Sequence, residues 1–142
     1  MGDQEKFETF KQQLVEDNEK RYGREARAQY GDEAVDSSIR KVQGMSKAQF
    51  DQFNSLSAEL MATLSAAFKT GDPAGELAQK AADLHRQWLS YFWDNYSPAA
   101  HRGVAQMYVD DERFTAYYDS IQLGTAAFLR DAINIYADQL SS

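Results

Sequence analysis

Two histidines are the first candidates for a chemical role in this chain, because an imidazole nitrogen is a common metal ligand. His85 and His101 are the only ones in 142 residues, and cysteine is absent. An all-helical chain with two histidines invites a haem hypothesis, in which one ring ligates the iron. The sequence has no C-x-x-C-H attachment site, and neither histidine belongs to a Glu-x-x-His pair that would favour a di-iron bundle. We therefore expect structural or surface histidines, with no metal and no cofactor.

The acidic segment "DDER" at 110–113 raises the question of acid–base catalysis. Carboxylates at the start of a helix are stabilised by the helix dipole, so Asp110 and Asp111 favour a structural role there. Arg113 is expected to pair with an acid. The sequence offers no nucleophile–base arrangement and no glycine loop that would cradle a phosphate. We expect a protein without catalytic residues.

Aromatic rings concentrate in "WLSYFWDNY", which spans residues 88–96. Aromatic side chains at helical spacing most often form a core. Successive helical positions lie about 100° apart, however, so the rings at 91, 92 and 93 cannot all face one core. Some of them must face solvent, a partner or a cavity, and aromatic walls with a few polar groups are typical of binding pockets. The cluster therefore favours a ligand pocket.

The length and composition indicate one acidic domain, and no alternating run is long enough to propose a strand, so the chain is expected to be all-α. The net charge is −7 and the pI is about 4.8, so the segment is not expected to contact nucleic acid directly. No apolar run approaches the length of a membrane span, and the first residues do not resemble a signal peptide. We expect a cytoplasmic location and no membrane partner.

Capping residues predict where several helices begin. Asp72 precedes Pro73, and Ser97 precedes Pro98, so each pair is expected to start a helix. Apolar spacing of three and four residues then predicts five helices between 46 and 140, with Gly71 ending the first and Asp110 capping the fourth. "SKAQ" at 46–49 is typical of a capping box at the start of the first of these helices.

Residues 1–45 are expected to form a weakly docked helical arm, followed by a helical core at 46–142. Phe7, Phe10 and Leu14 form a narrow apolar stripe in an otherwise charged stretch. Their burial contributes about 1.5–3 kcal/mol each. Ordering about 15 residues costs on the order of 15–30 kcal/mol of backbone entropy, of which helical hydrogen bonds offset a part. Such a helix is not secure alone.

Five segments of the chain form a recognisable set. Three lie in the second half: "HRQW" at 85–88, "GVAQMYVDDERFTAYYD" at 103–119 and "GTAAFLRDAINIYA" at 124–137. Two lie near the start: "KFETFK" at 6–11 and "LVEDNEKRYG" at 14–23. Together they resemble the TipA-S antibiotic-recognition domain, the ligand-sensing part of many MerR-type transcriptional activators. The resemblance spans nearly the whole chain.

This resemblance implies a globin-like helical fold without haem and a broad cleft for large amphipathic, often peptide-like antibiotics. It also implies that the N-terminal segment closes over the bound drug as a lid, carrying Phe7, Phe10 and Leu14. In full-length regulators the ligand switches transcription through a separate DNA-binding segment, whereas a domain without that segment sequesters the drug.

One position departs from the family pattern. Members that trap thiopeptides covalently use a cysteine in the loop after the "HRQ" helix, and ungapped matching places Tyr96 there. A phenol with a pKa of about 10 is almost fully protonated at neutral pH and is a poor nucleophile. We therefore expect reversible binding, against an aromatic wall that suits flat ligands.

On this interpretation the chain binds an antibiotic without catalysis. Asp111 and Arg113 hold the turn between two helices of the cleft. The alternatives are a haem-binding globin-like protein and a helical protein–protein interaction domain. The expected ligand-binding residues are Trp88, Phe92, Trp93, Tyr96, His101, Met107, Tyr108, Phe114, Tyr117 and Tyr118.

Overall fold

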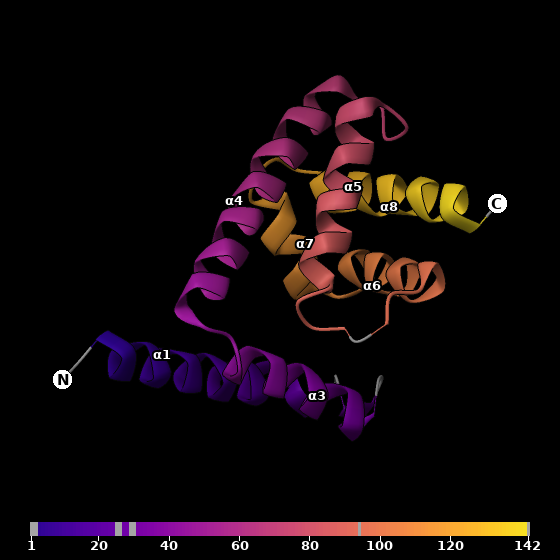
Figure 1. Ribbon diagram of the computed structural model, residues 1–142. Coiled ribbons are helices and arrows are strands. Elements are labelled where there is room, and N and C mark those ends of the chain that lie inside the picture. The colour runs from indigo at the N-terminus through magenta and orange to yellow at the C-terminus, as the bar shows by residue number, and fades with distance from the viewer. Residues whose placement is uncertain (1–2, 25–26, 29–30, 94, 142) are drawn as a thin grey trace. The chain divides into compact units, whose positions relative to one another are not determined.

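A computed structural model describes residues 3–24, 27–28, 31–93 and 95–141 (Figure 1). Within these ranges the regular secondary structure is helical throughout and no strand occurs, which confirms the all-α prediction. The chain divides into two units. The first comprises Met1–Asn54 with Tyr91–Asp94, and the second comprises Ser55–Ser90 with Asn95–Ser142. Each unit has its own packing. The expected boundary at residue 45 stays a prediction.

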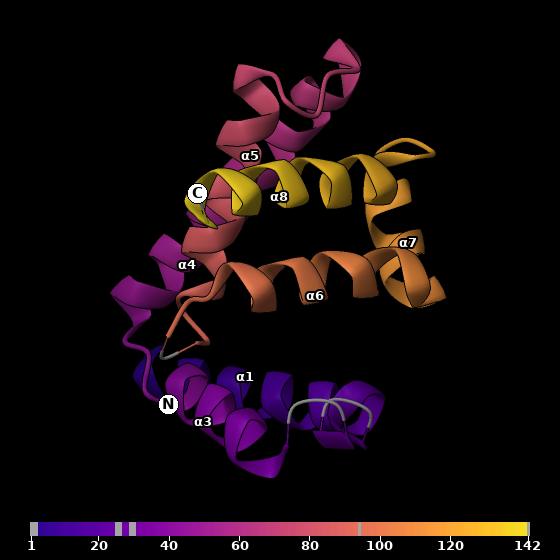
Figure 2. The ribbon, with the colours of Figure 1, turned by 90° about the vertical axis from the view of Figure 1, so that its right-hand side faces the viewer.

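The first unit is built from α1 (Asp3–Asn18), the π-helix η1 (Glu19–Gly23), α3 (Asp32–Gln43) and the start of α4 (Lys47–Thr70). α1 and α3 lie side by side in Figures 1 and 2 and contact each other. The Phe50 ring meets Phe7 and Phe10 edge-on, with ring centroids 5.3 and 5.6 Å apart. Leu14 packs against the same cluster, so the apolar stripe of α1 faces the start of α4.

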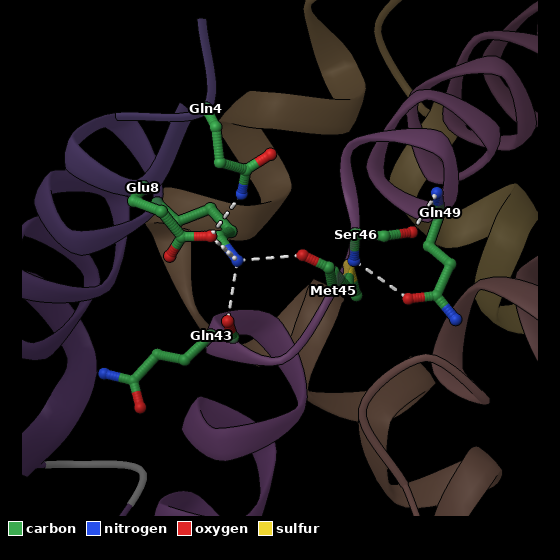
Figure 3. Close-up of polar contacts among 7 residues, drawn as sticks. Gln4, Glu8, Gln43, Met45, Ser46 and Gln49 are labelled. Atoms are coloured by element: carbon green, nitrogen blue, oxygen red, sulfur yellow. Dashed lines mark hydrogen bonds and ion pairs between the residues drawn. The ribbon is translucent and has the colours of Figure 1, made fainter. Parts of the chain in front are cut away.

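A buried lysine joins α1 to the end of α3. The Nζ atom of Lys11 donates hydrogen bonds to the carbonyl oxygens of Gln43, at 2.6 Å, and Met45, at 2.8 Å (Figure 3). It also pairs with Glu8 at 3.2 Å and lies 4.7 Å from the ring centroid of Phe7. The last carbonyls of a helix lack intrahelical donors, and a cation is favourable there. Lys11 therefore satisfies the carboxyl end of α3.

The ends of α4 follow the sequence signals. Ser46 Oγ accepts a hydrogen bond from the Gln49 amide at 3.1 Å, and Gln49 Oε1 accepts one from the Ser46 amide at 2.9 Å (Figure 3). This reciprocal pair confirms the predicted capping box. At the other end, Gly71 has a φ of 71°, a left-handed conformation that favours glycine and ends the helix.

The second unit contains the rest of α4, α5 (Glu76–Leu89), α6 (Pro98–Asp110), α7 (Glu112–Asp119) and α8 (Thr125–Ser141). Figure 2 shows α6 and α8 side by side in opposite directions, with α7 linking them at one end. α5 and α8 also contact each other. Both helices carry fully buried alanines, and small side chains let helix backbones approach closely: Ala78, Ala81 and Ala82 on α5, and Ala126, Ala132 and Ala137 on α8.

One predicted helix start is wrong. α5 begins at Glu76 with Gly75 as its N-cap, and not at Pro73. Instead, Asp72 Oδ1 accepts a hydrogen bond from the Ala74 amide at 3.0 Å. A short acidic side chain that bonds an amide two residues ahead closes a turn, which here competes with the cap.

The other two caps bring α6 and α7 into place. Ser97 caps α6 as predicted, accepting a hydrogen bond from the Ala100 amide at 3.0 Å, with Pro98 in the first helical position. α7 is capped by Asp111 and not by Asp110. Asp110 is the last residue of α6 and therefore helical, whereas an N-cap needs the extended backbone that Asp111 has.

Candidate functional site

The centre of the second unit is a chain of four hydrogen-bonding side chains, which we call the relay: Tyr96, His101, His85 and Tyr108. His101 and Tyr108 are seven residues apart on α6, so they lie on one face two turns apart. His85 comes from α5, and Tyr96 lies two residues before Pro98. The Ser97 cap and Pro98 therefore fix the backbone that carries Tyr96.

The relay is continuous. His85 Nδ1 lies 2.9 Å from His101 Nε2, and the planes of the two imidazole rings differ by only 3°, so the rings meet edge to edge through this hydrogen bond. His85 Nε2 lies 2.9 Å from the Tyr108 hydroxyl, and His101 Nδ1 lies 2.7 Å from the Tyr96 hydroxyl. Each contact has the length of a normal hydrogen bond, so all four ring nitrogens have a partner.

The relay is buried except at one end. His85 and His101 are 0% exposed and Tyr108 is 3% exposed, whereas Tyr96 is half-buried. Burial, and secondly the charge of Arg86, lower the pKa of His101 to about 4. Burial also holds the pKa of His85 well below its usual value, with His101 acting in the same direction. Both histidines are therefore neutral at physiological pH, where each ring carries one N–H.

A second set of polar contacts supports Tyr96. The Tyr136 hydroxyl on α8 donates to Asp83 Oδ1 at 2.6 Å and accepts from Arg86 Nη1 at 3.3 Å. The Arg86 guanidinium stacks 4.3 Å from the centroid of the Tyr96 ring. A planar guanidinium on an aromatic face is favourable. Burial raises the pKa of both tyrosines, so they stay protonated at neutral pH.

This geometry argues against the haem alternative. Haem iron needs a histidine nitrogen with a free lone pair. Every nitrogen of His85 and His101 is within hydrogen-bond distance of another side chain, and both rings are buried among protein atoms. In the described ranges, moreover, His, Asp and Glu side chains form no group of three that could hold a metal ion.

The predicted ligand-binding residues of the second unit lie around the relay to different depths. Trp88 is half-buried, with its ring centroid 5.7 Å from that of His85. Tyr108 has Phe114 at 5.6 Å and Tyr118 at 4.8 Å. Tyr117 is 57% exposed at 5.0 Å from Tyr118, and Met107 is half-buried on α6. Buried, half-buried and exposed rings thus all occur on α5, α6 and α7.

Asp111 and Arg113 lie at the start of α7. The Asp111 carboxylate accepts from the Arg113 amide and Nε at 3.0 Å each, and from Nη2 at 2.6 Å. These hydrogen bonds from Arg113 lower the pKa of Asp111. Nearby, the Thr115 hydroxyl donates to the carbonyl oxygen of Tyr108 at 2.7 Å, which ties α7 to the end of the relay.

Phe92 and Trp93 belong to the first unit. The Phe92 ring meets Phe53 edge-on at 5.5 Å, and its carbonyl oxygen accepts from the Ser38 hydroxyl. The Trp93 carbonyl oxygen accepts from Lys41 Nζ at 3.1 Å. Of the predicted lid residues in this unit, Phe7 is buried, Leu14 is half-buried and Phe10 is 50% exposed.

The hydrogen bonds of His85 to His101 and Tyr108 are not predicted from the sequence. One signal was available. His85 lies on α5 between Ala81 and Leu89, four residues away on either side, and both are buried. A polar ring on such an apolar face needs buried hydrogen-bond partners.

Comparison with known proteins identifies the family. A family model described as the TipAS antibiotic-recognition domain matches residues 22–136, which include the whole relay. The chain belongs to the TipAS antibiotic-recognition domain family. No helix in the described part of this TipAS domain is long and apolar enough to cross a membrane.

Relatives of the domain occur in longer proteins. The HTH-type transcriptional activator TipA of Streptomyces coelicolor is 33% identical over 132 residues, covering 92% of this chain and 51% of the relative. The HTH-type transcriptional activator mta of Bacillus subtilis is 28% identical over 141 residues, covering 97% and 53%. The chain thus spans about half the length of these relatives.

A solved structure is also similar. TipAS from Streptomyces lividans, in complex with nosiheptide, superposes with a TM-score of 0.73 at 31% identity. The match covers 87% of this chain and 88% of the other. That structure is described as part of a thiopeptide antibiotic multidrug resistance system.

Proposed function

We propose that this TipAS domain binds large hydrophobic or heteroaromatic antibiotics reversibly, by stacking against the aromatic side chains around the relay. The observation that carries the proposal is the match, over 87% of the chain, to a TipAS structure that holds the thiopeptide nosiheptide. Thiopeptides are therefore the first ligand class to test.

The half-exposed side chains supply the binding surface in this proposal. Trp88, Tyr96, Met107 and Phe114 are neither buried nor fully exposed, so each keeps an accessible part while its base is packed. Buried His101, Tyr108 and Tyr118 support these side chains from within. Rigid aromatic surface of this kind binds flat ligands with little loss of side-chain entropy.

Reversible binding without catalysis follows from the chemistry of the same residues. Burial raises the pKa of Tyr96, so its hydroxyl stays protonated and is a poor nucleophile at neutral pH. Neither histidine offers an accessible nitrogen to act as a general base, because both rings are fully buried and hydrogen-bonded.

The proposed biological role follows the relatives, which are named HTH-type transcriptional activators. In a protein of that kind the domain acts as the effector-sensing part of a MerR-type regulator, and ligand binding changes transcription through a separate DNA-binding segment. As a separate protein, the same domain sequesters the drug and confers resistance. A helix-turn-helix encoded in frame upstream supports the sensor, and its absence supports sequestration.

Tryptophan fluorescence tests the binding directly, because the chain has two tryptophans, Trp88 and Trp93. We expect a saturable change in emission with nosiheptide, or with another large aromatic antibiotic, at micromolar concentration or below. Trp88→Phe and Trp93→Phe variants, titrated in parallel, assign the change to one ring. A flat response across thiopeptides and oligoaromatic antibiotics, with no heat of binding in calorimetry, contradicts the proposal.

The proposed lid has a matched test on the surface of α1. Phe10 is 50% exposed and has an edge contact with Phe50, so Phe10→Ala is expected to lower the free energy of unfolding by only about 1 kcal/mol. If this ring covers the ligand, its loss weakens binding by roughly tenfold or more. Leu140→Ala, which truncates a 44% exposed apolar side chain at the end of α8, is the control. Equal affinities in both variants contradict the lid.

A further inference from the structure

The distances in the relay couple the tautomers of its two histidines. A neutral histidine carries one N–H and one bare nitrogen, so only one proton can lie between His85 Nδ1 and His101 Nε2. If both nitrogens carried protons, two N–H groups would point at each other across 2.9 Å. If neither did, two lone pairs would face each other at that distance. The two rings must therefore adopt the same tautomer.

Two arrangements of the relay satisfy every hydrogen bond. In the inward arrangement, Tyr96 donates to His101 Nδ1, His101 Nε2–H donates to His85 Nδ1, and His85 Nε2–H donates to the Tyr108 oxygen. In the outward arrangement all three bonds reverse, so Tyr108 donates to His85 and His101 donates to Tyr96. Both hold the same four protons, and neither carries a net charge.

Conversion of one arrangement into the other leaves the number of protons and the net charge of the relay unchanged. Three protons move one position along the relay from Tyr96 towards Tyr108. Tyr96 takes up one proton and Tyr108 loses its other proton, so the number of protons is conserved. Because Tyr108 is only 3% exposed, its proton exchanges with solvent during transient local opening of the surrounding helices. No oxidant, metal or further group is required.

Tyr96 is the one member of the relay that is half-buried, whereas the other three are buried. In the inward arrangement the outer side of the Tyr96 oxygen accepts a hydrogen bond, and in the outward arrangement its O–H donates one. We propose that Tyr96 is a specificity-determining residue whose hydroxyl either donates to or accepts from a ligand, and that the relay behind it sets which. This inference rests on the proposed ligand-binding function.

The donor or acceptor state of Tyr96 determines which ligand groups it can bind. The site takes aromatic ligands that present either a carbonyl acceptor or an N–H or O–H donor, and amide-rich aromatic antibiotics carry both. A site with a fixed donor leaves a buried polar group unpaired against the wrong ligand, which weakens binding. A reversible relay avoids that loss, which favours recognition of more than one drug.

The same reversal reaches α7. In the inward arrangement the Tyr108 proton is available to Tyr118, whose ring lies 4.8 Å away, centroid to centroid. In the outward arrangement that proton points to His85. Whether a ligand group at Tyr96 donates or accepts a hydrogen bond therefore changes the direction of the Tyr108 O–H, between α6 and α7.

Ring-nitrogen NMR of protein labelled with 15N-histidine tests the relay without any ligand. Protonated and bare imidazole nitrogens differ strongly in 15N shift, and only His85 and His101 contribute signals when no histidine tag is present. In the wild type both rings must show the same tautomer or the same tautomer mixture. Different tautomers at the two rings overturn the proposal, whatever the variants do.

Two variants at opposite ends sharpen the test. An unpaired buried N–H is less tolerable than an unpaired acceptor. Tyr96→Phe should therefore move both rings towards the Nε2–H tautomer, and Tyr108→Phe should move both towards Nδ1–H. We expect the tautomer ratio to change by roughly tenfold or more in each direction. Rings that stay unchanged, or shift independently of each other, overturn the proposal.

Addition of nosiheptide separates this inference from the proposed function. If fluorescence shows that nosiheptide binds, both rings of the wild type should change their tautomer ratio together, and those of Tyr96→Phe should not. Binding with unchanged ratios overturns the specificity role of Tyr96. If nosiheptide does not bind, the proposed function fails for this ligand, while the spectra of the free variants still decide whether the relay reverses.

Discussion

The two buried histidines make the stability of the domain depend on pH in a calculable way. In the unfolded chain each imidazole has a pKa of about 6.5, whereas burial lowers the pKa of His101 to about 4 in the folded protein and that of His85 well below its usual value. Because the folded state resists protonation, the contribution of the two histidines to stability is complete above the unfolded pKa and is lost progressively as the pH falls from there towards the lower folded pKa. Between pH 7 and pH 5 the unfolded state takes up about one proton per histidine that the folded state does not.

The expected loss of stability is about 2 kcal/mol for each histidine over this interval, or about 4 kcal/mol for the pair. That is a large part of the 5–15 kcal/mol typical of a domain. Urea unfolding at pH 7, 6, 5.5 and 5 measures it as a shift of the midpoint. As a control, His101→Asn keeps a neutral polar side chain and should lose about 2 kcal/mol over the same interval. An unfolding free energy that stays constant between pH 7 and pH 5 would refute the reasoning.

Four further variants, three at helix ends and one in a helix interior, are tested by urea unfolding. Lys11→Met leaves the carbonyls at the end of α3 without their buried donor and should cost about 1–3 kcal/mol, while Lys6→Met, on the exposed side of α1, changes little. Gly124→Ala should destabilise by about 1 kcal/mol or more because Gly124 has a φ of 97°. Gly103→Ala, where an added Cβ meets nothing within 4 Å, should instead stabilise α6 by about 0.5–1 kcal/mol. Ser97→Ala removes the cap of α6 and should cost about 1 kcal/mol, and an unchanged midpoint contradicts that role.

Helices and their caps could be predicted where the signal lies within one or two turns. The apolar spacing located α4 to α8, and the Ser46–Gln49 and Ser97 caps needed only three residues of context. The two wrong cap predictions, at Asp72 and Asp110, also depend on only one or two neighbouring residues. A short acidic side chain satisfies a turn as readily as a helix, and one residue decides whether the backbone is extended or helical.

The relay and the buried lysine could not be predicted in this way, because their partners are distant in sequence. His85 reaches His101 over 16 positions and Tyr108 over 23, and Lys11 reaches Gln43 over 32. Such contacts depend on how helices pack, and periodicity within one helix does not specify that. The aromatic cluster at 88–96 favoured a ligand pocket, and that stays a prediction, because Phe92 and Trp93 belong to the first unit and Trp88 and Tyr96 to the second. Which of these rings touches a ligand also stays a prediction.

The buried alanines of α5 and α8 have a consequence for how binding properties can change over time. At fully buried positions such as Ala81 and Ala132 a larger side chain has no room, and overpacking typically costs about 1–3 kcal/mol. Half-exposed rings such as Trp88 and Phe114 carry no such constraint on their outer edge. Substitutions that change drug preference without destabilising the domain are therefore expected at only a few surface positions. A directed-evolution library confined to those rings should yield folded proteins with new specificities far more often than one spread over the helices.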